Sequence, residues 1–179
     1  MLSNKTPAAY LLRLYAWEML EQNGALNLIT IKGKPKIPVI PVNDEPEYRD
    51  SGKAYIIYGW SENEENNVRP IQRGNISFRI IAEDSNQLNH ITSILARGME
   101  DEEETATSIN WWSTSHTADL KGIRFTWVKT VLVESADAAD TEGGQVEGTV
   151  IVGYRYVSSQ EVITFKPGTT IAGTDGAWQ

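Results

Sequence analysis

The side chains of this chain that have the right types for catalysis are two histidines and their neighbours. His116 adjoins Ser115 and precedes Asp119, and these are the residue types of a hydrolytic triad. Members of such triads meet through the fold and rarely adjoin in sequence. His90 has no neighbour at a spacing typical of a metal site or a general base, so a surface or hydrogen-bonded role is favoured for it. We predict no catalytic residue.

Carboxylates offer a second possibility, because Asp44, Glu45 and Glu47 lie close together and Glu100–Glu104 are consecutive. Neither set has the alternate spacing and central glycine of a calcium loop. Solvent-exposed charge is the ordinary interpretation, and an acidic surface that faces something negative is the functional one. A metal-assisted hydrolase that uses the acids near Asp44 with a histidine is the enzyme alternative.

Phosphate-binding loops are not indicated either. The glycine-containing stretches "IIYGWSENEENN" and "EGGQVEGTV" lack the lysine or the strand–turn–helix context of such loops. The sequence therefore predicts no metal and no cofactor, and it favours a binding or structural role over an enzyme.

Composition indicates one globular domain. The chain has 179 residues, of which 40% are hydrophobic and 22% charged, which are ordinary globular values. It has no cysteine, which excludes disulfides and thiolate chemistry and suits a reducing cytoplasm. No apolar run approaches the roughly 18 residues that span a bilayer, so we expect a soluble protein with no membrane partner.

The charge is acidic, with 16 Lys and Arg against 24 Asp and Glu, for a net charge of −8. This balance argues against a groove that grips nucleic acid through its phosphates. It suits a surface past which DNA moves without binding, because like charges repel over about 8 Å at physiological salt.

The elements of the first half follow from capping and alternation. Thr6 and Pro7 predict a helix over about 7–22. Pro38 and Pro41 confine the next extended segment to a sheet edge or an arm. A strand is predicted over 53–60, followed by a polar loop, "SENEENNVRP".

The second half alternates again. "RGNISFRIIAED" predicts a strand, and Ser85 is the expected N-cap of a helix that ends near Gly98. A loop, "TATSINWWSTSHTADL", separates this helix from two strands at about 122–134 and 144–158. An acidic connection that ends in two glycines predicts that these strands form a long antiparallel hairpin.

Together these elements predict an α+β fold with a mixed or mostly antiparallel sheet, two helices packed on one face and a long C-terminal β-hairpin. We place a single domain at 1–165. The Gly- and Thr-rich tail at 166–179 is predicted to be a flexible arm.

This order of elements resembles the tail terminator proteins of long-tailed bacteriophages, also called tail completion or head–tail joining proteins. The resemblance covers about residues 7–158. It rests on an early amphipathic helix, the extended segment "IPVIPVNDEPEY", the strand "RGNISFRIIAED" that runs directly into the helix "SNQLNHITSIL", and a late hairpin that ends on "GTVIVGYRYV". It contains no diagnostic motif, and no functional residue carries over from the family.

The resemblance implies a structural protein that forms a hexameric ring on the end of the tail tube and stops its polymerisation. The other side of the ring meets the head connector or a stopper protein, and DNA passes through the lumen without specific binding. The protein would be assembled in the host cytoplasm and would reside in the tail or neck of the virion. Another head–tail joining or tail-tube protein is the alternative within this class, and a module that binds a peptide or small ligand is a further one.

Surfaces for assembly can be proposed from the pattern. The polar face and free edge of 144–158 are expected to meet a neighbouring subunit, and a pair of loop tryptophans is expected to anchor a partner. Solvent, for the strand, and packing over the sheet, for the tryptophans, are the alternatives. The candidate interface residues are Trp111, Trp112, Glu147, Arg155, Tyr156 and Trp178. The candidate acidic residues facing the lumen, unless they simply face water, are Glu100, Asp101, Glu102, Glu103 and Glu104, with a second run at 134–142.

Overall fold

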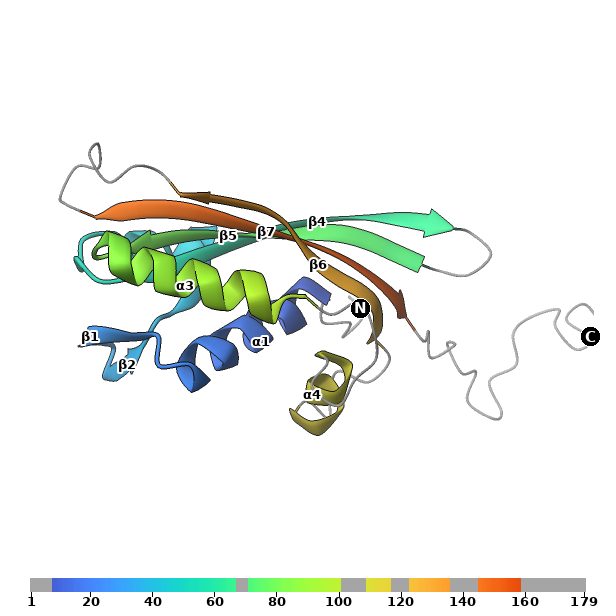
Figure 1. The fold of residues 1–179 in the computed structure, drawn as a ribbon, viewed down its shortest axis with the longest axis horizontal. Coiled ribbons are helices and arrows are strands. Elements are labelled where there is room, and N and C mark those ends of the chain that lie inside the picture. The colour runs from blue at the N-terminus through green and yellow to red at the C-terminus, as the bar shows by residue number, and fades with distance from the viewer. Residues whose placement is uncertain (1–7, 67–70, 101–108, 117–122, 136–144, 159–179) are drawn as a thin grey trace, which may run out of the picture.

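The computed structural model describes residues 8–66, 71–100, 109–116, 123–135 and 145–158 (Figure 1). The predicted arm at 166–179 lies outside these residues, as do Trp178, Asp101–Glu104 and most of the acidic run at 134–142.

A five-stranded sheet forms the framework, in the order β3-β4-β5-β7-β6. The central strands are β4 (Tyr55–Asn66), β5 (Ile71–Ala82) and β7 (Val146–Ser158), with β3 (Val39–Pro41) and β6 (Ile123–Ser135) at the edges. β3 runs parallel to β4 and every other pair is antiparallel. The predicted mixed sheet and its C-terminal hairpin, β6–β7, are therefore confirmed.

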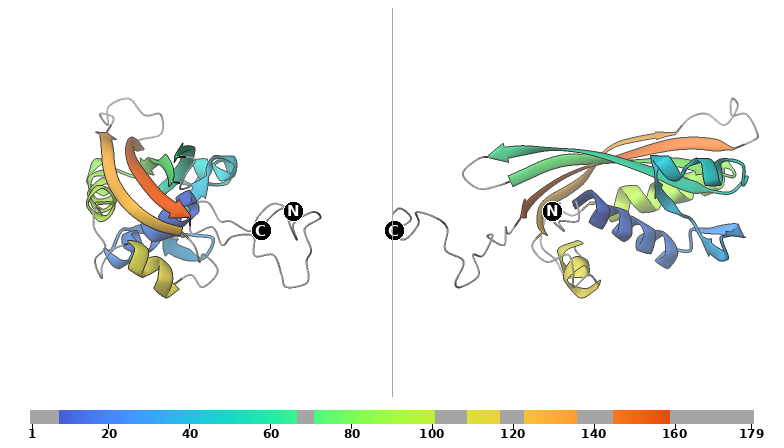
Figure 2. Two further views of the ribbon diagram at one scale, coloured as in Figure 1. Left: turned by 90° about the vertical axis from the view of Figure 1, so that its right-hand side faces the viewer. Right: turned by 180° about the vertical axis from the view of Figure 1, so that it is seen from behind.

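Two helices, α1 (Ala8–Gln22) and α3 (Ser85–Gly98), cover one face of this sheet (Figures 1 and 2). Gly24, with φ 73°, follows α1, and the amide of Ala25 closes the helix on the carbonyl of Leu20 at 2.9 Å. The side chain of Asp84 caps α3 by accepting a 2.7 Å hydrogen bond from the Gln87 amide. The predicted helix is confirmed, but its N-cap is Asp84 rather than Ser85.

Smaller elements complete the fold. β1 (Leu26–Ile31) and β2 (Lys34–Lys36) form a separate two-stranded hairpin. Its two turn residues, Lys32 and Gly33, both have positive φ, at 50° and 76°, as the right-handed twist of short hairpins requires. The short elements η1 (Val42–Asp44) and α2 (Pro46–Arg49) lead into β4.

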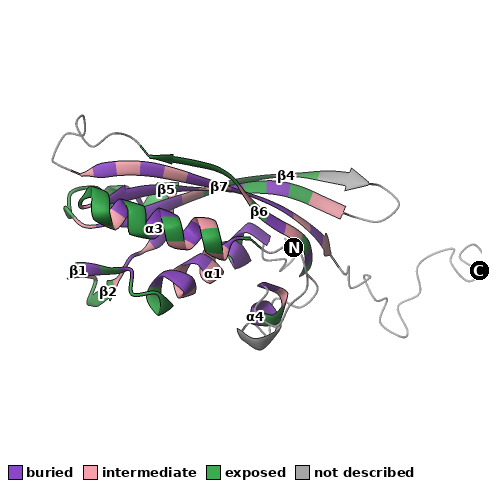
Figure 3. Ribbon diagram, viewed as in Figure 1, coloured by how far each residue is buried: buried purple, intermediate pink, exposed green. Residues whose placement is uncertain are grey.

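The main core lies between the helices and the sheet (Figure 3). Alternate side chains of β5 and β7 point into it, and Ile76, Phe78, Ile80 and Tyr154 among them are fully buried. A second, smaller cluster on the opposite face contains Ile40, Tyr48, Tyr55, Ile57 and Ile81. Among the described residues, the sheet is thus packed on both faces near β3 and α2.

Two local predictions were wrong. β4 continues through Ser61–Asn66, where a polar loop was expected, because this segment pairs with Ile71–Asn75 of β5. The expected tryptophan loop contains the helix α4 (Ile109–His116), whose Asn110 side chain donates to the Phe125 carbonyl at 2.7 Å and accepts from the Phe125 amide at 2.8 Å. In both places, tertiary pairing orders a polar sequence.

None of the helices in the described part of the chain is both long and apolar enough to span a bilayer.

Candidate assembly surfaces

The edge strand β6 exposes apolar side chains. Val131, Leu132 and Val133 are consecutive and exposed, with Val131 at 52% and Val133 at 49%, and Figure 3 shows this part of the strand as exposed. A β-bulge between Thr130 and Leu132 turns successive apolar residues outward. An edge strand with exposed β-branched residues is a template for pairing with another chain.

The opposite edge of the sheet is also partly open. β3 pairs with β4 only over Ile56–Tyr58. Among the described strands, Gly59–Asn66 therefore pairs on one side only, with β5. This part of β4 extends beyond the helices (Figures 1 and 2), and its Trp60 is exposed. Among the described strands, β6 and this part of β4 are thus two unlike edges that pair on one side only.

The expected free edge of 144–158 was wrong, because β7 lies inside the sheet and pairs with β5 on one side and β6 on the other. The predicted polar face of β7 is present, however. Arg155 lies opposite Arg73 in the pairing with β5 and opposite Trp127 in the pairing with β6, and it is half-buried. In the described part of the chain, the edges of β7 are paired and its other face lies in the core, so this polar face is the one that remains for a neighbouring subunit.

Glu147, on the same face, is already used within the chain. Arg79 donates to it from Nε and, at 3.4 Å, from Nη2. The same guanidinium lies 3.9 Å from Glu45, which also contacts Arg49 at 3.5 Å. The hydrogen bond to Glu147 raises the pKa of Arg79 above its ordinary value. This network links β5, β7 and α2 across the outer face.

Tyr156 was predicted to contact a neighbouring subunit. Its side chain instead faces the helices and is buried within its own chain. Its hydroxyl donates to Glu62 at 2.8 Å, and that of Tyr154 donates to the other carboxylate oxygen at 2.6 Å. Phe125 packs against both rings, with centroids 6.2 and 5.9 Å away. Burial first, and these hydrogen bonds second, raise the pKa of both phenols.

The two adjacent tryptophans differ in environment. Trp111 is 54% exposed on α4, whereas Trp112 is 7% exposed. The Trp112 indole donates to Glu18 of α1 at 2.5 Å and packs edge-on against Tyr15, with centroids 5.2 Å apart. The expectation of an exposed pair is wrong for Trp112, which joins α4 to α1, while Trp111 keeps the exposure that an anchor needs.

Glu100 is the only described member of the expected acidic lumen run, which spans residues 100–104, and it is exposed just after α3. Its carboxylate accepts a 3.2 Å hydrogen bond from the Thr130 amide on β6. The acidic run therefore begins beside the β6 edge.

The acids of the hydrolase alternative form ion pairs. Glu47 pairs with Lys32, and Glu45 with Arg49 and Arg79. Within the described ranges no group of three or more His, Asp or Glu side chains could hold a metal ion. His90 is exposed on α3.

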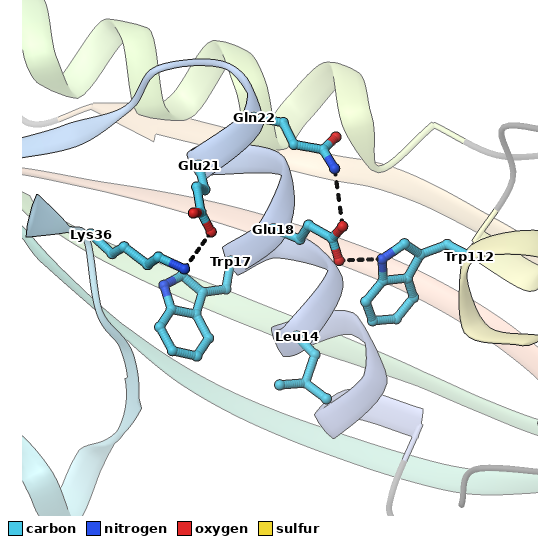
Figure 4. A pocket seen from close by; sticks show the side chains of 7 residues that line it. All are labelled: Leu14, Trp17, Glu18, Glu21, Gln22, Lys36 and Trp112. Carbon is cyan, nitrogen blue, oxygen red and sulfur yellow. Dashed lines mark hydrogen bonds and ion pairs between the residues drawn. The ribbon is translucent and has the colours of Figure 1, made fainter. Parts of the chain in front are cut away.

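Two pockets flank Trp17 of α1. The larger, of about 520 Å³, lies between α1, β2 and α4 (Figure 4). Its charged groups already pair, Lys36 with Glu21 at 2.6 Å and Glu18 with Gln22 at 3.0 Å and with Trp112. The smaller pocket, of about 290 Å³, is lined by four basic side chains and no acidic one. This pocket was not predicted from the sequence, although the alternating lysines of "KGKPK" were a signal for it.

No protein-family model and no curated protein matches the chain.

Proposed function

We propose that this protein is a structural virion protein of a long-tailed bacteriophage, a tail terminator that closes into a hexameric ring on the end of the tail tube. One face of the ring would stop tube polymerisation and the other would meet the head connector or stopper protein. DNA would pass through the lumen. The six-fold state, the partners and the place in the virion come from the resemblance of the order of elements to that family.

The observation that supports the ring is the pair of unlike open edges on one sheet. A closed ring of identical subunits needs two different patches on each chain, in a head-to-tail contact. The β6 edge around Val131–Val133 and the β4 edge at Gly59–Asn66 are two such patches. Pairing β6 of one copy with β4 of the next would continue the sheet across the boundary.

The charge of the chain supports the passage of DNA. A ring of six copies of a chain with net charge −8 repels a polyanion in its lumen instead of holding it. A structural role also suits a chain whose described carboxylates stabilise the fold through ion pairs and hydrogen bonds, as Glu62 and Glu147 do.

The test is the mass and shape of the purified protein, measured by light scattering and electron microscopy. We expect single six-membered rings. Val131→Lys places a charge on the β6 edge and is expected to give monomers, whereas His90→Lys, at an exposed position on α3 away from both edges, should leave the rings intact. Open-ended tubes would indicate a tail-tube subunit instead. Monomers at high concentration that do not bind tail-tube ends would contradict the proposal.

A further inference from the structure

The smaller pocket is a concentrated basic site on an acidic protein. It lies between α1, the β1–β2 hairpin and β3, and its volume is about 290 Å³. Its lining contains four basic side chains and no acidic one, in a chain of net charge −8. The basic residues are Arg13, Lys32, Lys34 and Lys36.

Arg13 is held in place for binding. Its Nε donates to the Val39 carbonyl at 2.8 Å, and its guanidinium lies 5.5, 5.6 and 5.9 Å from the rings of Tyr10, Trp17 and Tyr58. These contacts fix the planar group and leave its Nη donors, since one of five N–H groups is used. Among the described residues no carboxylate lies within ion-pair distance of it.

Three lysines of the β1–β2 hairpin line the pocket, Lys32 from its turn and Lys34 and Lys36 from β2. Lys32 lies over the Tyr48 ring at 4.9 Å and pairs with Glu47, and Lys36 lies over Trp17 at 5.5 Å and pairs with Glu21. Lys34 is exposed and has no carboxylate partner in the described part of the chain. Positive charge therefore remains to be balanced.

An unsatisfied donor lies at the same place. The indole Nε1 of Trp17 is buried and has no hydrogen-bond partner among the described residues, although buried polar groups in native proteins are nearly always paired. Trp17 lines both pockets. An oxygen-bearing ligand near Lys36 would bring an acceptor toward this group.

The walls indicate a peptide rather than a bare inorganic anion. Ile31, Pro38, Val39 and Ile40 supply apolar surface, and Tyr48 an aromatic one. The adjoining β1 strand carries Leu28 and Ile29, which are 85% and 57% exposed. A volume of about 290 Å³ is at the lower limit for small-molecule sites. It fits one or two side chains of an acidic segment, whose aliphatic carbons can contact these walls.

We propose that this pocket binds the acidic run Asp101–Glu104 of a second copy of the chain. The run supplies four consecutive carboxylates and follows Glu100, whose side chain contacts β6 at Thr130. The pocket includes Val39 and Ile40 of β3, at the opposite edge of the sheet. When β6 of one copy meets the β3–β4 edge of the next, the run and the pocket come to the same boundary.

This contact deepens the proposed ring and rests on it, but the two can be tested apart. Peptide binding to the pocket is measured on single chains, whereas ring formation is measured by mass. Rings without peptide binding would overturn only the pocket contact. Lys34-dependent peptide binding without rings would overturn the ring and leave the pocket as a site for an acidic segment.

The experiment uses a fluorescent peptide that copies residues 99–106, Met-Glu-Asp-Glu-Glu-Glu-Thr-Ala. The receptor is the full chain with Glu102→Gln, Glu103→Gln and Glu104→Gln, so that no neighbouring run competes. We expect saturable binding that falls at least tenfold with Lys34→Glu. Arg73→Glu, the same charge change at an exposed site on β5, should leave binding unchanged.

Three results would overturn the proposal. The first is an absence of binding to this receptor while its melting temperature matches that of the unsubstituted chain. The second is equal binding of the Lys34→Glu variant. The third is displacement of the peptide by inorganic phosphate at the concentration of the peptide itself, which would indicate a general anion site. In the unsubstituted chain, Lys34→Glu should also weaken self-association measured by light scattering.

Discussion

The indole Nε1 of Trp112 donates a 2.5 Å hydrogen bond to Oε2 of Glu18, 94 positions earlier in the chain. This bond connects α4 to α1 at the rim of the larger pocket (Figure 4). A carboxylate that is half-buried here accepts from Gln22 as well, so the helix α4 is held by a charge-assisted bond in addition to packing.

Trp112→Phe tests this connection. The ring still packs against Tyr15 but the donor is lost, so the free energy of unfolding should fall by about 1.5–3 kcal/mol, the usual value for a hydrogen bond to a charged group. Trp111→Phe, on the exposed side of α4, should change it by less than about 0.5 kcal/mol. Urea denaturation of both variants measures the difference, and equal effects would show that the bond to Glu18 contributes nothing.

Gly74→Ala is expected to destabilise the fold by about 1–3 kcal/mol. A β-carbon at this position would lie 2.5 Å from the Ser61 carbonyl and 2.7 Å from the Tyr154 hydroxyl. Gly59→Ala, on the partner strand, is the matched control because its nearest neighbour is the Ser77 hydroxyl at 3.7 Å. Thermal denaturation should give a clearly lower melting temperature only for the first variant.

Alkaline pH should unfold the protein through Tyr154 and Tyr156. Both phenols have pKa values raised above the ordinary value of about 10, so the folded chain keeps two protons that the unfolded chain releases. Their contribution to stability is complete below pH of about 10 and is lost as pH rises through the higher pKa of the folded state. Above pH 10, each phenol should lower the free energy of unfolding by about 1.4 kcal/mol per pH unit.

The measurement is urea denaturation between pH 9 and 11. Tyr154→Phe and Tyr156→Phe should each make the decline with pH shallower by the contribution of one phenol. A decline that is unchanged in both variants would assign the alkaline loss to other groups.

The pair of Arg79 and Glu147 should be weak and sensitive to salt. Their side chains are 47% and 37% exposed, so a double-mutant cycle with Arg79→Gln and Glu147→Gln should give a coupling of about 0.5–1 kcal/mol. The coupling should shrink toward zero at 1 M salt, where the Debye length is about 3 Å. A coupling that persisted at high salt would show that the hydrogen-bond geometry, rather than charge, carries it.

Much of the fold was predictable because its signals are local. Thr6 and Pro7, the alternation of Ile76, Phe78 and Ile80, and the proline spacing at Pro38 and Pro41 each report on their own segment. These signals correctly predicted the helix α1, the strand β5 and the edge strand β3. The hairpin of the last two strands was also correct, since antiparallel neighbours in sequence usually pair.

The interface residues were harder to predict because they depend on strand order. The alternation of Val146–Tyr156 shows which side chains share a face, but not that β5 and β6 occupy both edges of this strand. Trp111 and Trp112 read alike in sequence, and only the packing of α4 on α1 distinguishes them. Whether Glu147 and Arg155 also contact another subunit stays a prediction.

The basic pocket could not be predicted from the sequence because its residues come from separate segments. Arg13 lies far from the lysines in sequence, and its position above Val39 depends on how α1 crosses β3. The alternation of the lysines is visible in the sequence, but it does not by itself indicate a binding site. The aromatic rings of Tyr10 and Trp17, which hold Arg13 beside the lysines, come from α1 and meet the hairpin only in the folded chain.

The position of β7 between β5 and β6 has a consequence for biosynthesis. Arg79 of β5 meets Glu147 of β7 across 68 residues, so the second edge of β5 cannot be paired until the ribosome has released the chain through β7. Until then the nascent protein carries an unpaired hydrophobic strand, which is where an incomplete chain aggregates. Because so much of the sheet depends on distant partners, refolding should be slow for a chain of this size.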